Sequence, residues 1–175
     1  MIKIFQLLSL LFFALGVNAQ KGIAVDSAFK ASTPPIPTYE RIKEVPPFNI
    51  LLVSDSTMFA KDALQKNKKT LVIVFSPSCE HCKHATETLL ADYKKFKDVN
   101  IVMATVSNYD ATKKFFDEYK LQDYPNIKVG VDKEYFLGKF YEVRTYPSIF
   151  LYDKKGFFKK FFDWSYSMKD IAKAL

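Results

Sequence analysis

The segment that most limits the fold of this chain is T-L-V-I-V-F-S at residues 70–76. Its residues are apolar or β-branched on both alternating faces, which is typical of a strand covered on two sides. The segment runs directly into S-P-S-C-E-H-C-K-H, and apolar residues then recur at helical spacing, namely Leu89, Leu90, Tyr93 and Phe96. We therefore expect a strand that leads into the cysteines and a helix to about Lys97, with the second cysteine inside its first turns.

Apolar runs on either side extend this pattern. Strands are expected at 48–53, 100–106, 148–153 and 157–163, and helices at 57–67, 111–119 and 167–175. The alternation of strands and helices predicts a parallel sheet with right-handed crossovers. Lys154-Lys155-Gly156 is a turn that predicts a hairpin between the last two strands. The fold class is therefore α/β with a mixed central sheet, a C-terminal β-hairpin and a short closing helix.

The helix expected at 57–67 depends on local signals. Ser54-Asp55-Ser56 supplies side chains that cap helix N-termini. The buried side of this helix would hold Met58, Phe59, Ala63 and Leu64.

The first residues have the pattern of a secretory signal. Lys3 precedes an almost uninterrupted apolar run at 4–17, and Ala19 is a small residue suited to cleavage. A run of about 14 residues is shorter than the roughly 20 that span a bilayer as a helix. No cysteine follows the run, so we expect no lipid-modified cysteine. We expect residues 1–19 to be removed and the protein to be exported to the periplasm.

The remaining chain divides by composition. Residues 20–47 hold Pro34, Pro35, Pro37, Pro46 and Pro47 and show little apolar periodicity, which predicts an extended leader without its own core. Residues 48–175 are long enough for one compact domain.

The charge of the chain indicates no nucleic-acid partner. The net charge is +7, but Arg41 and Arg144 are the only arginines and the lysines are scattered along the chain. Proteins that read nucleic acids use arginine forks and a concentrated basic face. Scattered lysines are typical of solvated surfaces and loop tips.

Both cysteines and both histidines of the chain lie within residues 79–84. A C-x-x-C pair at a strand-to-helix junction places the first thiol near unpaired backbone N–H groups and the positive end of the helix dipole, which favour a thiolate. Cys79 is therefore the expected nucleophile. Cys82, one turn further on, is close enough to attack a mixed disulfide at Cys79 and release the partner.

Three other interpretations of this stretch were compared. A structural zinc site needs four ligands, usually from two such pairs, and this chain has one pair. Side chains of Cys79, His81, Cys82 and His84 project around a helical turn and do not converge on one ion, so we expect no metal. A transient copper site of the two thiolates and one histidine stays open. A purely structural disulfide would close too short a loop to restrict the unfolded chain much.

Three segments together resemble the thioredoxin superfamily: T-L-V-I-V-F, S-P-S-C-E-H-C-K and R-T-Y-P-S-I-F-L-Y-D-K-K-G. Residues 48–175 are similar, more narrowly, to exported thiol-disulfide oxidoreductases of the TlpA/ResA and redoxin type found in Bacteroidetes. Residues 129–143 look like the insertion that those redoxins carry. The resemblance implies helices on both faces of the sheet, with Cys79 as the attacking and Cys82 as the resolving cysteine.

The resemblance also assigns the segment that faces the cysteines. Pro147 matches the cis-proline of the family, and a cis bond there exposes the backbone of Tyr146 to an extended substrate strand. Tyr146 is bulkier than the residue usual at this position. The family's tryptophan before the first cysteine is replaced by Pro77-Ser78, and Ile73 stands where thioredoxins carry a buried acid. Proton transfer must therefore use another group or water.

The two residues between the cysteines oppose each other in tuning the redox potential. His81 can stabilise the Cys79 thiolate and so make the disulfide more oxidising. Glu80 adds negative charge beside the thiol and favours a reductant. The resemblance favours reduction of exported protein thiols and disulfides, with a membrane-bound electron donor. We also expect no cofactor and a monomeric protein.

A second hypothesis is a thioredoxin-like copper-binding chaperone or an assembly factor that holds a client without turnover. Copper chaperones of this general fold usually add a distal histidine, whereas both histidines here lie within residues 81–84.

Overall fold

The computed structural model describes residues 35–175. The expected signal at 1–19 and the first part of the expected leader, 20–34, lie outside the described residues. Within residues 35–175, no helix is both long enough and apolar enough to span a bilayer.

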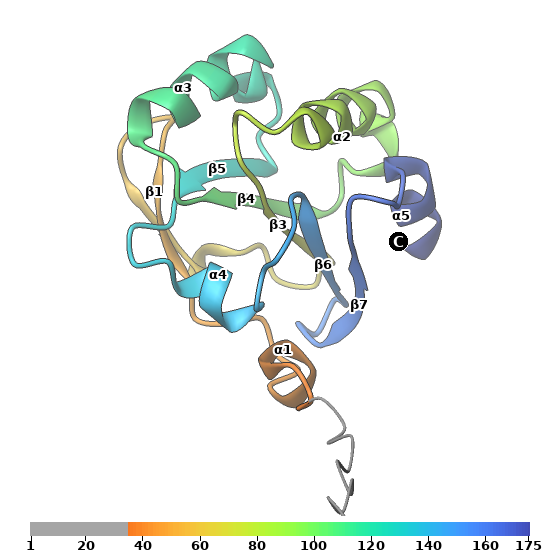
Figure 1. Ribbon diagram of the computed structural model, residues 1–175. Helices are drawn as coiled ribbons and strands as arrows, with labels where there is room; N and C mark the ends of the chain where they lie inside the picture. Colours follow the sequence, from red (N-terminus) through yellow and green to blue (C-terminus); the bar gives the residue numbers. More distant parts are fainter. Residues whose placement is uncertain (1–34) are drawn as a thin grey trace, which may run out of the picture. The chain divides into compact units, whose positions relative to one another are not determined.

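The centre of the fold is one mixed seven-stranded sheet with the order β2-β1-β5-β4-β3-β6-β7 (Figure 1). Its strands are β1 (Asn49–Leu52), β2 (Met58–Ala60), β3 (Thr70–Val74), β4 (Asn100–Thr105), β5 (Ile127–Val131), β6 (Ser148–Tyr152) and β7 (Phe158–Phe162). Strands β3, β4 and β5 are parallel, and the other pairings are antiparallel. The expected mixed sheet and its C-terminal hairpin are therefore confirmed.

Helices cover both faces of this sheet, and each face has its own core. The helices are α1 (Thr38–Arg41), α2 (Glu80–Ala91), α3 (Tyr109–Glu118), α4 (Phe136–Phe140) and α5 (Met168–Ala174), with short 3-10 turns at Lys61–Ala63, Tyr93–Lys95 and Leu121–Asp123. Ile73 of β3 shares a core with α2, α3 and α5. Val72 and Val74 point to the other face, where they share a core with α4. This alternation explains why β3 is apolar at both parities.

The expected helix at 57–67 is wrong. The segment forms β2, which pairs with β1, followed by a 3-10 turn. Asp55 accepts a hydrogen bond from the Thr57 backbone N–H at 3.0 Å, and Ser56 has a φ of 61°. The side chain expected to cap a helix thus closes a turn that reverses the chain. Met58 is 55% exposed, as an edge strand allows.

Two other boundaries differ from the sequence expectations. Helix α2 ends at Ala91 and a 3-10 turn follows, so the expected helix is shorter. Residues 129–131, assigned to an insertion, belong to β5 inside the sheet. A Cβ on Gly130 would lie 2.7 Å from the Leu51 backbone oxygen, so the glycine permits β1 to approach β5 closely.

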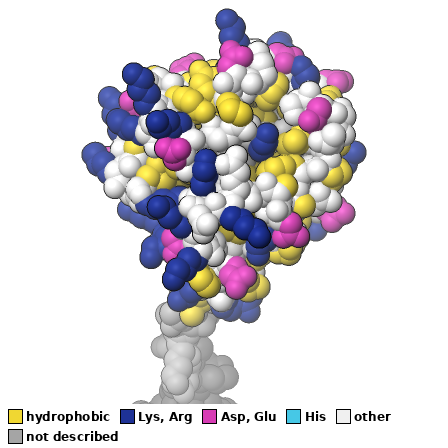
Figure 2. Space-filling view, turned by 180° about the vertical axis from the view of Figure 1, so that it is seen from behind, with side chains coloured by type: hydrophobic (Ala, Val, Ile, Leu, Met, Phe, Trp, Pro, Cys, Tyr) yellow, Lys and Arg dark blue, Asp and Glu magenta, His cyan; other side chains and the backbone are white. Residues whose placement is uncertain are grey.

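The described end of the leader packs against the β6–β7 hairpin. The Val45 N–H donates to the Gly156 oxygen at 3.0 Å, and the Phe158 N–H donates to the Lys43 oxygen at 2.6 Å. Val45 is buried in the core that α4 covers. On the face shown in Figure 2, Lys and Arg side chains are spread among acidic and uncharged ones.

A buried tyrosine pair joins the segment after α4 to strand β6. The ring of Tyr141 stacks on Phe150 with centroids 3.8 Å apart, and the Tyr141 and Tyr152 hydroxyls are hydrogen-bonded at 2.8 Å. Both tyrosines are fully buried. Burial raises the pKa of both phenols, so both stay neutral and each is the partner of the other.

Replacing Tyr141 by Phe should lower the free energy of unfolding by about 1–3 kcal/mol, because the Tyr152 hydroxyl is left buried without its partner. Urea unfolding measures the change. The double variant Tyr141→Phe/Tyr152→Phe should be less destabilised than the sum of the single variants, by about 1 kcal/mol or more. Strict additivity would contradict the pairing.

Candidate active site

Cys79 lies in the short connection between β3 and α2. After Val74 the chain makes a turn in which the Cys79 N–H donates to the Ser76 oxygen at 3.1 Å. Cys79 is the N-cap of α2, and its sulfur accepts a hydrogen bond from the Cys82 backbone N–H at 3.4 Å. The cap thus gives the sulfur an N–H donor at the positive end of the helix, as the spacing of the motif predicts.

The two thiols differ sharply in their surroundings. Cys79 is half-buried, whereas Cys82 is 2% exposed and belongs to the core beneath α2. Burial, together with its contact with Cys79, raises the pKa of the Cys82 thiol well above its ordinary value. Cys82 is therefore protonated at neutral pH, and Cys79 is the more accessible of the two thiols.

Tyr146 and Pro147 face the cysteines from the loop before β6. The Tyr146–Pro147 peptide bond is cis, which confirms the expectation from the family resemblance. The Cys79 thiol donates to the Tyr146 backbone oxygen at 3.6 Å. The register of the sheet brings these positions together, because Val74 at the end of β3 is paired with Ser148 at the start of β6.

Glu80 and His81, the residues between the cysteines, contact groups other than the Cys79 sulfur. The Glu80 carboxylate accepts from the Lys83 ammonium at 2.7 Å, so its charge is partly neutralised. The His81 ring packs against Trp164, with centroids 5.1 Å apart and planes tilted by 32°. Among the described residues, no hydrogen bond joins Glu80 or His81 to Cys79.

Trp164 is the neighbour of the site that the sequence analysis did not find. It lies in the turn between β7 and α5, 82 residues or more from the cysteines along the chain. Its one sequence signal is that it is the single tryptophan of the chain. No periodicity or motif spacing in the sequence links Trp164 to Cys79.

A small cavity lies behind Cys82. Its lining is almost wholly apolar and consists of Ile73, Phe75, Cys82, Ala85, Thr86, Leu89, Met103, Pro147 and Met168. The Thr86 hydroxyl donates to the Cys82 backbone oxygen at 2.9 Å. No carboxylate of residues 35–175 lines this cavity, so the Cys82 proton has no acidic side chain among them to accept it there.

The other histidine of the motif lies on the surface. His84 Nδ1 is 4.0 Å from a Glu87 carboxylate oxygen, and both side chains are exposed. Within residues 35–175, His, Cys, Asp and Glu side chains do not gather in any group of three or more that would hold a metal ion.

Comparisons with known proteins agree on one fold. Residues 58–166 match the family model described as a thioredoxin-like domain. No curated protein sequence matches the chain.

Solved structures share the fold at low sequence identity. A secreted disulfide oxidoreductase of Mycobacterium tuberculosis, homologous to Escherichia coli DsbE, is 19% identical with a TM-score of 0.62, over 74% of this chain and 96% of that one. StoA from Bacillus subtilis is 19% identical with a TM-score of 0.58, over 73% and 95%. A thiol-disulfide oxidoreductase from Bacteroides fragilis is 15% identical with a TM-score of 0.62, over 76% and 100%.

The difference in burial predicts selective alkylation. At about pH 7.5, iodoacetamide should modify Cys79 faster than Cys82 by a factor on the order of 100, because the Cys82 thiol is buried and protonated. Mass spectrometry of Cys79→Ser and Cys82→Ser, each with one thiol left, measures the two rates. Because the Cys82 pKa is raised, its rate should increase only at strongly alkaline pH. Equal rates at neutral pH would contradict the assigned roles.

Proposed function

The chain belongs to the thioredoxin-like family, and we propose that it is an exported thiol-disulfide oxidoreductase that reduces disulfides of protein clients. The observation that carries the proposal is the geometry at Cys79. Its sulfur lies at the N-terminus of α2, 3.4 Å from the Cys82 N–H and 3.6 Å from the Tyr146 oxygen. A half-buried nucleophile, a buried resolving thiol and an adjacent backbone oxygen suit exchange with an extended client strand.

In the first step, the Cys79 thiolate attacks one sulfur of a client disulfide. A mixed disulfide forms between Cys79 and the client, and the second client sulfur leaves as a thiolate. Cys82 then loses its proton and attacks the Cys79 sulfur, which forms the Cys79–Cys82 disulfide and releases the first client sulfur. Two electrons have passed from the protein to the client. The proton of Cys82 goes to the leaving client thiolate or to water, because the cavity behind Cys82 has no carboxylate.

The surroundings of Cys79 support the reducing direction. A disulfide is more oxidising when the protein stabilises the thiolate of the reduced form. The Cys79 sulfur accepts one backbone hydrogen bond, and the His81 ring is packed on Trp164. Pairing with Lys83 weakens the effect of Glu80 on the potential, so the reducing direction rests on the Cys79 sulfur having no side-chain donor among the described residues.

The setting of the reaction follows from the start of the chain and from the site. The signal pattern at 1–19 supports export to the periplasm, where a membrane-bound donor would return the Cys79–Cys82 disulfide to the dithiol. The M. tuberculosis protein of the same fold is described as secreted. All residues assigned to the reaction, including Tyr146 and Pro147, come from one chain, so a monomer suffices.

A trapping experiment tests the exchange. Cys82→Ser should accumulate a mixed disulfide with a disulfide-bonded client, because the resolving thiol is gone while Cys79 still attacks. Non-reducing gel electrophoresis and mass spectrometry identify the adduct at Cys79. Cys79→Ser is the matched control and should form none. Absence of exchange by the wild type and by Cys82→Ser, together with tight stoichiometric Cu(I) binding, would instead support the copper-binding chaperone.

The reduction potential tests the direction. Equilibration in glutathione or dithiothreitol buffers should place the Cys79/Cys82 couple in the more reducing half of the range from about −270 mV to about −120 mV. The physical reason is the limited stabilisation of the Cys79 thiolate. A potential above roughly −160 mV would identify an oxidant instead.

A further inference from the structure

Trp164 is an exposed aromatic residue in contact with the redox motif. It is the only tryptophan of the chain and is 51% exposed. Its ring packs on His81, the third residue of the C-E-H-C motif, with a centroid distance of 5.1 Å. A large apolar ring that stays half in water while it covers a polar ring is not explained by core packing.

The fold holds Trp164 in place from both sides. Phe162, the last residue of β7, and Met168, the first residue of α5, are both buried. Between them, the Tyr166 N–H donates to the Asp163 oxygen at 3.2 Å and the Ser165 N–H donates to the Asp163 carboxylate at 3.0 Å. The position of Trp164 is therefore set by an ordered turn.

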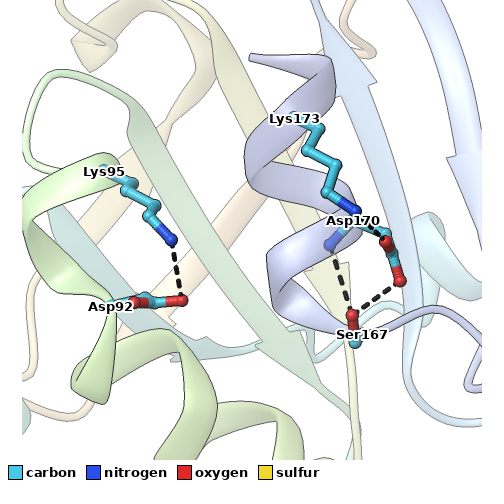
Figure 3. A network of polar contacts seen from close by, with 5 residues as sticks. All are labelled: Asp92, Lys95, Ser167, Asp170 and Lys173. Atoms are coloured by element: carbon cyan, nitrogen blue, oxygen red, sulfur yellow. Dashed lines mark hydrogen bonds and ion pairs between the residues drawn. The ribbon is translucent and has the colours of Figure 1, made fainter.

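Helix α5 secures the far side of this turn. Figure 3 shows its cap, in which the Asp170 N–H donates to the Ser167 hydroxyl oxygen at 3.2 Å. The Ser167 hydroxyl donates to the Asp170 carboxylate at 2.6 Å, and Lys173 donates to the same carboxylate at 3.0 Å. Met168 and Ile171 then fix α5 against the core that contains Cys82.

The contact with Trp164 bears on Cys79 because it decides which way the His81 ring turns. Side chains in a helix cover the turn on the N-terminal side of their own Cα. His81 lies in the first turn of α2, two residues after the N-cap Cys79, so an imidazole released from Trp164 can turn toward that N-cap. An imidazole N–H that donates to the Cys79 thiolate would stabilise the reduced form.

We propose that Trp164 is a positioning residue that holds the His81 ring away from the Cys79 sulfur and so keeps the couple reducing. The inference rests on the proposed function and adds a residue that sets the reduction potential of the Cys79/Cys82 couple. Cys79 finds its hydrogen-bond partners in the backbone of Cys82 and Tyr146, while His81 is held by the C-terminal segment. Glu80 and His81 have opposite effects on the reduction potential, and a residue outside the motif thereby decides how strongly His81 acts.

The test is the equilibrium of each variant with glutathione, in which the protein disulfide and two glutathione thiols give the protein dithiol and one glutathione disulfide. In Trp164→Ala the freed imidazole reaches the thiolate, so the constant should shift threefold to tenfold toward the dithiol, about 14 to 30 mV less negative. Trp164→Phe keeps an aromatic face for His81 and should stay within about twofold of the wild type.

A double variant separates positioning from a general structural effect. His81→Ala removes the imidazole, so Trp164→Ala should cause no shift in a His81→Ala background. Tyr166→Ala is the matched control, because it removes an aromatic ring from the same turn that packs on Phe162 instead of His81. It should leave the constant unchanged. Thermal unfolding checks that each variant is folded, and Trp164→Leu replaces Trp164→Ala if the alanine variant unfolds.

Each outcome decides the inference. A shift toward the dithiol that requires His81 supports it. No shift in Trp164→Ala, a shift in the opposite direction, or an equal shift in the His81→Ala background overturns it while the proposed function stands. If the wild-type protein does not exchange with glutathione or with a client disulfide, the proposed function fails and the positioning role fails with it.

Discussion

The position of β3 between β4 and β6 is the constraint on which the site depends. The strand pairs in parallel with β4 and antiparallel with β6, so its carboxyl end is held from both sides. The pairing of Val74 with Ser148 places the Tyr146–Pro147 loop beside the start of α2. Because only residues 75–79 separate β3 from α2, the N-cap sulfur of α2 lies 3.6 Å from the Tyr146 oxygen. The position of Cys79 and of the loop that faces it are thus consequences of one strand register.

The same arrangement makes the two thiols unequal. One turn of helix separates the half-buried Cys79 from Cys82 in the core, where burial keeps the thiol protonated. Ile73 and the other apolar residues around Cys82 strengthen this effect, because they supply packing without a proton acceptor. In the proposed reaction, the attack by Cys82 therefore needs a base from the client or from solvent. The packing of the core and the proposed order of the chemical steps are therefore linked at Cys82.

Much of the fold followed from local patterns. The apolar runs predicted β1, β3, β4, β6 and β7. Strands β3, β4 and β6 are buried along their whole length, which requires apolar residues at nearly every position. The expected helix at 57–67 was wrong because Asp55 and Ser56 suit a turn as well as a helix cap, and pairing with β1 decided between them. Strand β5 was missed because Lys128 and Gly130 interrupt its apolar pattern, and only its place between β1 and β4 makes it a strand.

The sequence by itself determined that a buried strand ends in a C-x-x-C motif at a helix start, and its resemblance to a family indicated the cis-proline. These are properties of neighbouring residues or of a recognisable motif. The tertiary structure alone decided which groups surround the motif. Tyr146 reaches Cys79 through the pairing of β3 with β6, and Trp164 reaches His81 through the turn between β7 and α5. No spacing rule relates residues so far apart, because packing of the sheet and its helices brings them together.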